Sequence, residues 1–222
     1  MLLHPLPLDE TVWPSAMDSF GRDAVAPRLY DLGDSIEAWA SAVVDMVDTE
    51  PMVLVGNSVG GSCAIEIALQ VPDRVELMVL IGTKAGHRPE PAFRDEAIEV
   101  LTTEGMGAAW PRYWAPLFGA LTDGSVIERA REIAERQSID DVVRGVRVFH
   151  SRPDRADQIR MLEVPIVVVS GEYDRAPANG RAFAAGLRRG VFRSVPGAGH
   201  YVPLERPLEL REIIRDSISA LV

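Results

Sequence analysis

Short apolar runs rich in Val, Ile and Leu alternate along this 222-residue chain with longer stretches of helical periodicity. Such runs predict strands at residues 1–3, 23–29, 52–55, 75–81, 166–170 and 191–195. Pro27 weakens the second of these predictions, because proline cannot donate a hydrogen bond to a neighbouring strand. Runs that are apolar throughout indicate strands buried on both faces. The pattern therefore predicts an α/β fold, with a mostly parallel sheet flanked by helices.

Helices are predicted between these strands. Ser35 can cap a helix whose apolar stripe runs over residues 36–47, and residues 60–70 form the helix after the 52–55 strand. Two further helices are expected at residues 178–187 and 204–222. These helices supply the layers that cover the sheet.

Residues 83–160 differ from the rest of the chain, because they carry no strand signal. Helical patterns are predicted at residues 91–103, 106–118, 125–136 and 139–150. We therefore expect one domain, in which residues 1–82 and 161–222 form the core and residues 83–160 form a small helical cap.

Charge and composition exclude several classes of partner. The formal net charge is −10 and the isoelectric point about 4.9, which disfavours binding to nucleic acid or to an anionic membrane surface. Cys63 is the only cysteine, so an internal disulfide is excluded. The first ten residues lack the pattern of a secretory signal, and no apolar run reaches the ~18 residues of a membrane helix. We expect a cytoplasmic protein without nucleic-acid or membrane partners.

The strongest local motif is Gly56-Asn57-Ser58-Val59-Gly60, between a predicted strand and a predicted helix. This Gly-x-Ser-x-Gly sequence is typical of a nucleophile elbow. A Cβ at either glycine would crowd the neighbouring strand and helix. The turn would expose the Ser58 hydroxyl at the carboxyl edge of the sheet, beside a helix N-terminus that stabilises an anion.

Two further residues follow predicted strands. Asp174 lies on the loop after the 166–170 strand, and His200 on the loop after the 191–195 strand. Open α/β sheets build their sites at the carboxyl ends of parallel strands, so Ser58, Asp174 and His200 are expected to meet. Their order in the chain is that of a serine, acid and histidine triad on this type of sheet.

These residues together resemble the α/β-hydrolase superfamily, especially its small esterases, enol-lactonases and carbon–carbon bond hydrolases. The resemblance is specific over residues 1–82 and 163–222, and only general in the cap. It implies the α/β-hydrolase fold and a catalytic triad of Ser58, His200 and Asp174, without a cofactor or metal. The sequence His4-Pro5-Leu6-Pro7 resembles the His-Gly-x-Pro loop of the family. The resemblance implies that the amides of Leu6 and Val59 form the oxyanion hole and that Trp13 packs beneath the loop.

The sequence departs from the family pattern in two ways. Pro5 replaces the usual glycine, which fixes φ and removes one N–H group. The chain also begins within what resembles the third strand of the family, so the sheet is expected to lack the usual first two strands. An edge exposed in this way favours association, and a homodimer would cover it.

Several other residues have competing interpretations. Glu172 is an alternative acid to Asp174, Cys63 is expected to be a buried core residue, and the single lysine, Lys84, either reaches the pocket rim or stays in solvent. His87 and His150 are expected on the surface or in the cap, and no two histidines have the i, i+4 spacing of a metal site. Trp110, Trp114 and Tyr201 are our candidates for pocket residues. The aromatic residues of the cap are Trp110, Tyr113, Trp114 and Phe118. Together with Met106, they either line an acyl pocket or form the core of the cap.

The leading functional prediction is a serine hydrolase acting on a small or medium apolar carboxylic ester or lactone. A carbon–carbon bond hydrolase of a vinylogous diketone is the main alternative, because Gly-Asn-Ser-Val-Gly-Gly also resembles the elbow of those enzymes. A lyase or perhydrolase using the same triad remains open, as does a ligand-binding homologue with little turnover.

Overall fold

The computed structural model describes residues 1–13, 24–47, 50–87, 89–174 and 177–221. Within them, one five-stranded sheet has the order β1-β2-β3-β4-β5, and each neighbouring pair is parallel. The strands are β1 (Leu2–Leu3), β2 (Met52–Asn57), β3 (Val75–Ile81), β4 (Ile166–Gly171) and β5 (Gly190–Val195). This architecture confirms the predicted α/β-hydrolase fold with its parallel sheet.

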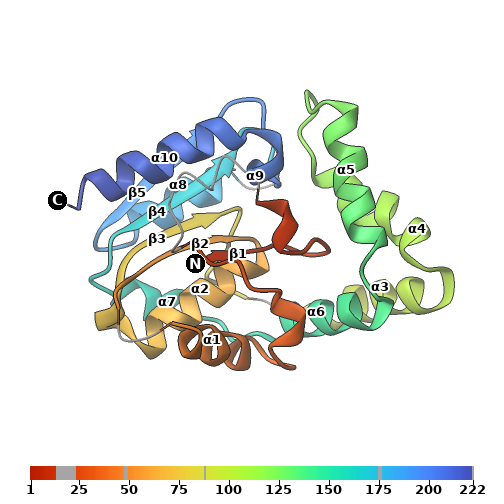
Figure 1. Cartoon of the computed structure of the whole chain (residues 1–222), viewed down its shortest axis with the longest axis horizontal. Coiled ribbons are helices and arrows are strands. Elements are labelled where there is room, and N and C mark those ends of the chain that lie inside the picture. Colours follow the sequence, from red (N-terminus) through yellow and green to blue (C-terminus); the bar gives the residue numbers. More distant parts are fainter. Residues whose placement is uncertain (14–23, 48–49, 88, 175–176, 222) are drawn as a thin grey trace.

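Helices cover both faces of the sheet (Figure 1). On one face lie α1 (Ile36–Asp45), α2 (Val59–Gln70), α7 (Ala156–Arg160) and α8 (Pro177–Ala185), and on the other lie α9 (Val202–Glu205) and α10 (Pro207–Ser219). Successive residues of a strand point to opposite faces. Accordingly, Leu80 packs with α1 and α2, whereas Val79 packs with α10.

The segment of residues 91–151, between β3 and β4, is mostly helical and lies to one side of the sheet (Figure 1). It contains α3 (Pro91–Glu104), α4 (Met106–Ala109), α5 (Gly124–Glu135) and α6 (Ile139–Ser151). Ser138 caps α6 by accepting a hydrogen bond from the Asp141 amide, and α3 packs against α6. This arrangement puts a layer of helices beside the carboxyl ends of the strands.

Three predicted elements differ in the structure. Residues 24–28 form no strand, although the Leu2 amide donates to the Val25 carbonyl at 2.8 Å, and Asp23 lies outside the described residues. Pro27 can donate nothing to β1, which explains why the pairing stops at one bond. The predicted 106–118 helix ends as α4 and continues as a π-helical turn, Trp110–Trp114, that contains Pro111. The closing helix is divided at Arg206, directly before Pro207.

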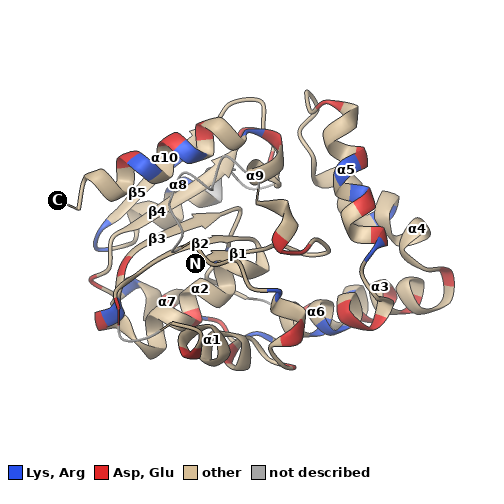
Figure 2. Cartoon of the chain, viewed as in Figure 1, with Lys and Arg blue, Asp and Glu red and all other residues tan. Residues whose placement is uncertain are grey.

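Charged residues lie mainly on the outer helices. Acidic and basic side chains alternate along α5 and α10, while the central strands are largely uncharged (Figure 2). No helix in the described ranges is both long and apolar enough to cross a bilayer.

Candidate active site

Ser58 occupies the sharp turn between β2 and α2. Its φ of 56° and ψ of −117° make it the only non-glycine residue with positive φ among those the structure describes. The turn is held by a bond from the Ser58 amide to the Ile81 carbonyl at 2.8 Å, and by the Ser58 carbonyl, which accepts from Gly61 at 3.0 Å. Such a conformation costs about 1–3 kcal/mol and is typical of functional turns.

The glycines around Ser58 are required by close packing, as predicted. A Cβ on Gly56 would lie 2.5 Å from the Gly60 backbone, and a Cβ on Gly60 would lie 2.1 Å from the Leu3 carbonyl oxygen. Gly61 has the same constraint against Thr83, whose Oγ1 would lie 1.9 Å away. Any side chain at these positions would separate α2 from β1 and β3.

Asp174 and His200 are brought together by the ends of β4 and β5. His200 Nδ1 lies 3.2 Å from Asp174 Oδ2, and each side chain is 13% exposed. The His200 amide donates to the Leu117 carbonyl at 2.8 Å. His200 is therefore oriented by a carboxylate on one side and by the segment after α4 on the other.

Gly82 is a site residue that the sequence analysis missed. It follows β3 with a φ of +55°, and a Cβ there would lie 2.7 Å from His200 Nδ1 and 3.0 Å from Asp174 Oδ2. Only glycine leaves space for this pair of side chains. A lone glycine after a strand was the available signal, but it is too common to be selective.

Glu205 is a second missed residue, and it organises the His200 loop. Its carboxylate accepts hydrogen bonds from the amides of Gly119 (2.8 Å), Gly199 (2.9 Å) and Tyr201 (2.9 Å), and from Thr122 Oγ1 at 2.5 Å. Glu205 is only 5% exposed. It therefore links the loop that carries His200 to the segment after α4.

The loop after β1 approaches the start of α2, where Val59 is the first helical residue. Leu6 lines the same cavity as Ser58, and its carbonyl accepts from Tyr201 Oη at 3.0 Å. His4 is completely buried, which lowers its pKa to about 4. Its Nε2 accepts from the Leu29 amide at 2.9 Å, so the ring proton is on Nδ1, which faces the Pro5 carbonyl at 3.2 Å. Neutral His4 thus ties the loop to the chain at Leu29.

A cavity of about 900 Å³ opens between the sheet edge and the helices of the 83–160 segment. Ser58, Asp174 and His200 all line it. The apolar part of the wall comes mainly from that helical segment: Phe93, Ala97, Tyr113, Trp114, Leu117, Val146 and Phe149. The structure therefore brings the three candidate residues to one space large enough for a small organic molecule.

The candidate pocket residues separate into two groups. Trp114 lines the cavity, and so does Tyr113. Trp110 and Tyr201 do not: both are buried in the core, and both contact Phe118, with ring centroids 6.1 and 4.7 Å apart. The pocket assignment of Trp110 and Tyr201 is corrected accordingly. Trp110 was a candidate because of its place on a predicted helix face, and Tyr201 because it follows His200. Neither signal shows that the side chain packs inward against Phe118.

The remaining candidates have local structural partners. Glu172 accepts from the Gly197 amide at 2.9 Å. Cys63 is buried, and burial raises the pKa of its thiol. Lys84 and His150 line the cavity, and burial together with Arg152 lowers the pKa of His150 to about 4. Trp13 is buried in the same core cluster as Leu8. Among the described residues, no three His, Cys, Asp or Glu side chains are placed to hold a metal ion.

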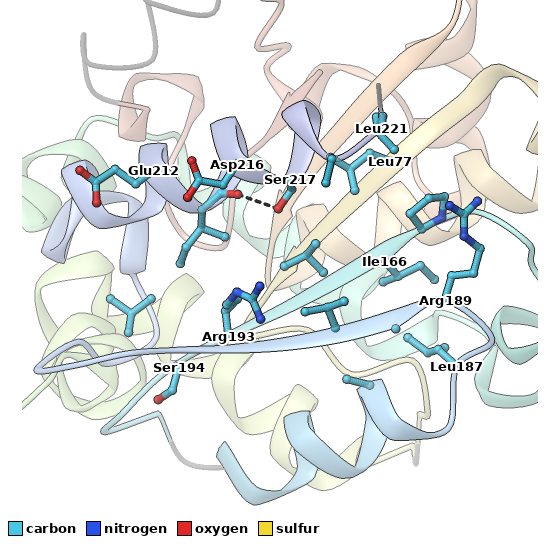
Figure 3. A pocket seen from close by; sticks show the side chains of 18 of the residues that line it. Leu77, Ile166, Leu187, Arg189, Arg193, Ser194, Glu212, Asp216, Ser217 and Leu221 are labelled. Carbon is cyan, nitrogen blue, oxygen red and sulfur yellow. Dashed lines mark hydrogen bonds between the residues drawn. The ribbon is translucent and has the colours of Figure 1, made fainter.

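A second cavity, of about 750 Å³, lies between β5, α8 and α10 (Figure 3). Its lining includes Leu77 and Ile166, near the starts of their strands, and the charged residues Arg193 and Asp216. The Ser217 hydroxyl, also in the lining, donates a hydrogen bond to the Ile213 carbonyl at 2.6 Å. It reaches the amino-terminal side of the sheet, away from Ser58. Sites on open α/β sheets form at the opposite, carboxyl side.

Known proteins with similar sequences are named as enzymes. A candidate 2-succinyl-6-hydroxy-2,4-cyclohexadiene-1-carboxylate synthase of Bacillus subtilis is 25% identical over 199 residues, which cover 81% of this chain and 70% of that protein. A 2-hydroxy-6-oxononadienedioate/2-hydroxy-6-oxononatrienedioate hydrolase of Paraburkholderia phymatum is 24% identical over 192 residues, with 78% and 64% covered.

The structure is also similar to that of a thermophilic esterase from Thermogutta terrifontis. The TM-score is 0.88 at 25% sequence identity, with 99% of this chain and 89% of the esterase covered. The model of the alpha/beta hydrolase family matches residues 1–213. The parallel sheet, the serine turn and this match over nearly the whole chain lead to one conclusion: the chain belongs to the α/β hydrolase family.

Proposed function

We propose that the protein is a serine hydrolase that cleaves a carboxylic ester or lactone. The observation that supports this most is that Ser58, in its strained turn, shares a cavity with a hydrogen-bonded His200–Asp174 pair. The esterase of Thermogutta terrifontis, with the same fold over 99% of this chain, adds support.

In the proposed mechanism, His200 Nε2 takes the proton of Ser58 as Oγ attacks the substrate carbonyl. Asp174 accepts the hydrogen bond from Nδ1, holds the useful tautomer and stabilises the imidazolium. The amides of Leu6 and Val59 stabilise the oxyanion, helped by the N-terminus of α2. The leaving alcohol takes the proton from His200, and water then attacks the acyl-enzyme by the same route in reverse.

The segment of residues 83–160 is proposed to act as the cap that selects the substrate. Its apolar side chains Phe93, Trp114 and Phe149 line the cavity. Such a wall accommodates a small or medium hydrocarbon chain next to the reacting carbonyl.

Labelling with a fluorophosphonate, followed by peptide mapping, tests the proposal. We expect a single adduct on Ser58, lost in Ser58→Ala and in His200→Ala. Ser62→Ala is the matched control, because Ser62 lines the same cavity and its loss should leave the adduct intact. Labelling that survives Ser58→Ala, or its absence from folded wild-type protein, would contradict an activated Ser58 and favour a ligand-binding role.

Carbon–carbon bond hydrolysis is the second candidate. It is favoured by the likeness to the 2-hydroxy-6-oxononadienedioate hydrolase, which covers 78% of this chain. The test is the turnover of a vinylogous ring-fission diketone, measured by the loss of its dienolate absorbance. Turnover of this diketone together with no turnover of 4-nitrophenyl esters would favour carbon–carbon bond hydrolysis over ester hydrolysis.

A further inference from the structure

Arg152, which directly follows α6, is a buried cation at the wall of the Ser58 cavity. It is 7% exposed, and its side chain lines that cavity. One guanidinium nitrogen donates to the Phe149 carbonyl, and the guanidinium carbon lies 4.0 Å above the centre of the Phe149 ring. No ion pair joins Arg152 to any carboxylate among the described residues.

A guanidinium has five N–H donors, and the Phe149 carbonyl accounts for one of them. Burial lowers the pKa of Arg152 to about 10, so the group is still charged at neutral pH. A buried charge with no carboxylate in contact is unfavourable, because the distant Asp154 compensates only part of the lost hydration. Arg152 lines a cavity that a ligand can enter, and no other hydrogen bond to its guanidinium is seen among the described residues.

The neighbouring carboxylates are engaged elsewhere or lie further away. Asp154, the nearest in sequence, is exposed, and its Oδ1 accepts from the Ala156 amide at 2.9 Å. Glu90 lines the cavity at its exposed rim, and Asp174 is bonded to His200. None of them neutralises Arg152 within ion-pair distance.

Other cations line the same cavity. Lys84 and Arg160 line the cavity with Arg152, although the net charge of the whole chain is −10. Arg160 already pairs with Asp157 at 3.2 Å. Ser62, Lys84 and Arg152 also line a third, small cavity, which places Arg152 near the first turns of α2. Glu66 lines it too, but its carboxylate is bonded to Arg155. Ser62 is one helical turn beyond Ser58, about 6 Å along the axis.

We propose that Arg152 binds a carboxylate group of the substrate, so that the chain cleaved at Ser58 carries an anionic end on the order of one helical turn, about 6 Å, or more from the reacting carbonyl. The inference rests on the proposed function and narrows it to esters or lactones of dicarboxylic acids. The apolar wall contacts the hydrocarbon part, and the planar guanidinium donates hydrogen bonds to both carboxylate oxygens.

Binding without turnover is the first test. Adipate and suberate, with their dimethyl esters for comparison, are titrated calorimetrically into wild-type protein and into Arg152→Met, Arg152→Lys and Arg160→Met. We expect at least one diacid to bind more tightly than its dimethyl ester, and to bind about 10- to 100-fold more weakly to Arg152→Met, the range for one charged hydrogen-bonded pair. Arg152→Lys should recover part of the loss. Arg160→Met, which removes a cation already paired, should change the affinity less than about threefold.

Kinetics is the second test. Mono-4-nitrophenyl adipate and 4-nitrophenyl methyl adipate differ only in the distant charge. We expect wild-type protein to prefer the acid, and the ratio of the two kcat/KM values to fall about 10- to 100-fold in Arg152→Met, chiefly through KM. An unchanged ratio in Arg152→Met and in Arg152→Lys, or diacid binding equal in all four proteins, would overturn the proposal. Diacid binding that depends on Arg152 without hydrolysis of either ester would instead refute the hydrolase and leave the carboxylate site standing.

Discussion

Replacing Glu205 should reveal how the His200 loop is held. In Glu205→Ala the amides of Gly119, Gly199 and Tyr201 lose their acceptor, and so does the Thr122 hydroxyl. Each buried donor left without a partner costs about 1–3 kcal/mol. Leaving three amides without an acceptor would lower the free energy of unfolding by roughly 3–9 kcal/mol. Water entering the vacated space restores some of these hydrogen bonds, so we expect a loss of about 3–5 kcal/mol.

Glu205→Gln is the conservative variant. The amide keeps one acceptor oxygen but places an NH₂ group against at least one donor, so the expected loss is smaller, about 1–2 kcal/mol. Because His200 lies directly after Gly199, both variants should also lower kcat for a 4-nitrophenyl ester more than they raise KM. The effect on kcat separates a role in positioning His200 from a purely structural one.

Urea unfolding followed by circular dichroism gives the free energy of unfolding, with Glu212→Ala as the matched control. Glu212 is an exposed glutamate on α10, so its loss should change the stability by less than about 0.5 kcal/mol. A loss below about 1 kcal/mol in Glu205→Ala would refute the reasoning, because it would mean that the amides do not depend on this carboxylate.

Three other predictions follow from the site. Ser58→Ala and His200→Ala should fold normally and lower kcat for ester hydrolysis about 10⁴-fold or more, and Asp174→Asn should lower it by a smaller factor. Steady-state kinetics measures these losses, and a near-normal rate in any variant would remove that residue from the mechanism. Gly82→Ala should lower kcat at least about 100-fold, because its Cβ would lie 2.7 Å from His200 Nδ1; an active variant with unchanged stability would show that the loop yields easily. His4 has a folded pKa of about 4 against 6.5 when unfolded, so the unfolded state binds the proton first as the pH falls. Stability should therefore decline between pH 6.5 and 4 by up to about 3 kcal/mol, and His4→Gln should flatten this part of the unfolding profile; an equal slope in both proteins would contradict the assignment.

Much of the fold follows from local sequence patterns. Most of the predicted strands and the helix predicted over residues 60–70 are present, because apolar runs and helical periodicity report burial that any α/β packing requires. The turn at Ser58 is equally local, since the glycines around it are needed by the geometry of a strand entering a helix. Parallel pairing then explains why Asp174 and His200, 26 residues apart, meet at one sheet edge.

Other features depend on contacts between distant segments. Residues 24–28, predicted as part of a strand, make a single hydrogen bond to β1. Trp110 and Tyr201 pack into the core around Phe118 rather than into the cavity. The partners of Glu205 at Gly119 and Thr122 are more than 80 residues away. Local pattern determined which residues are buried and where strands end, because these are properties of short segments. Only the tertiary structure decided which buried polar groups meet, because a hydrogen-bond partner or a counter-ion, as for Arg152, is set by the packing of the whole chain.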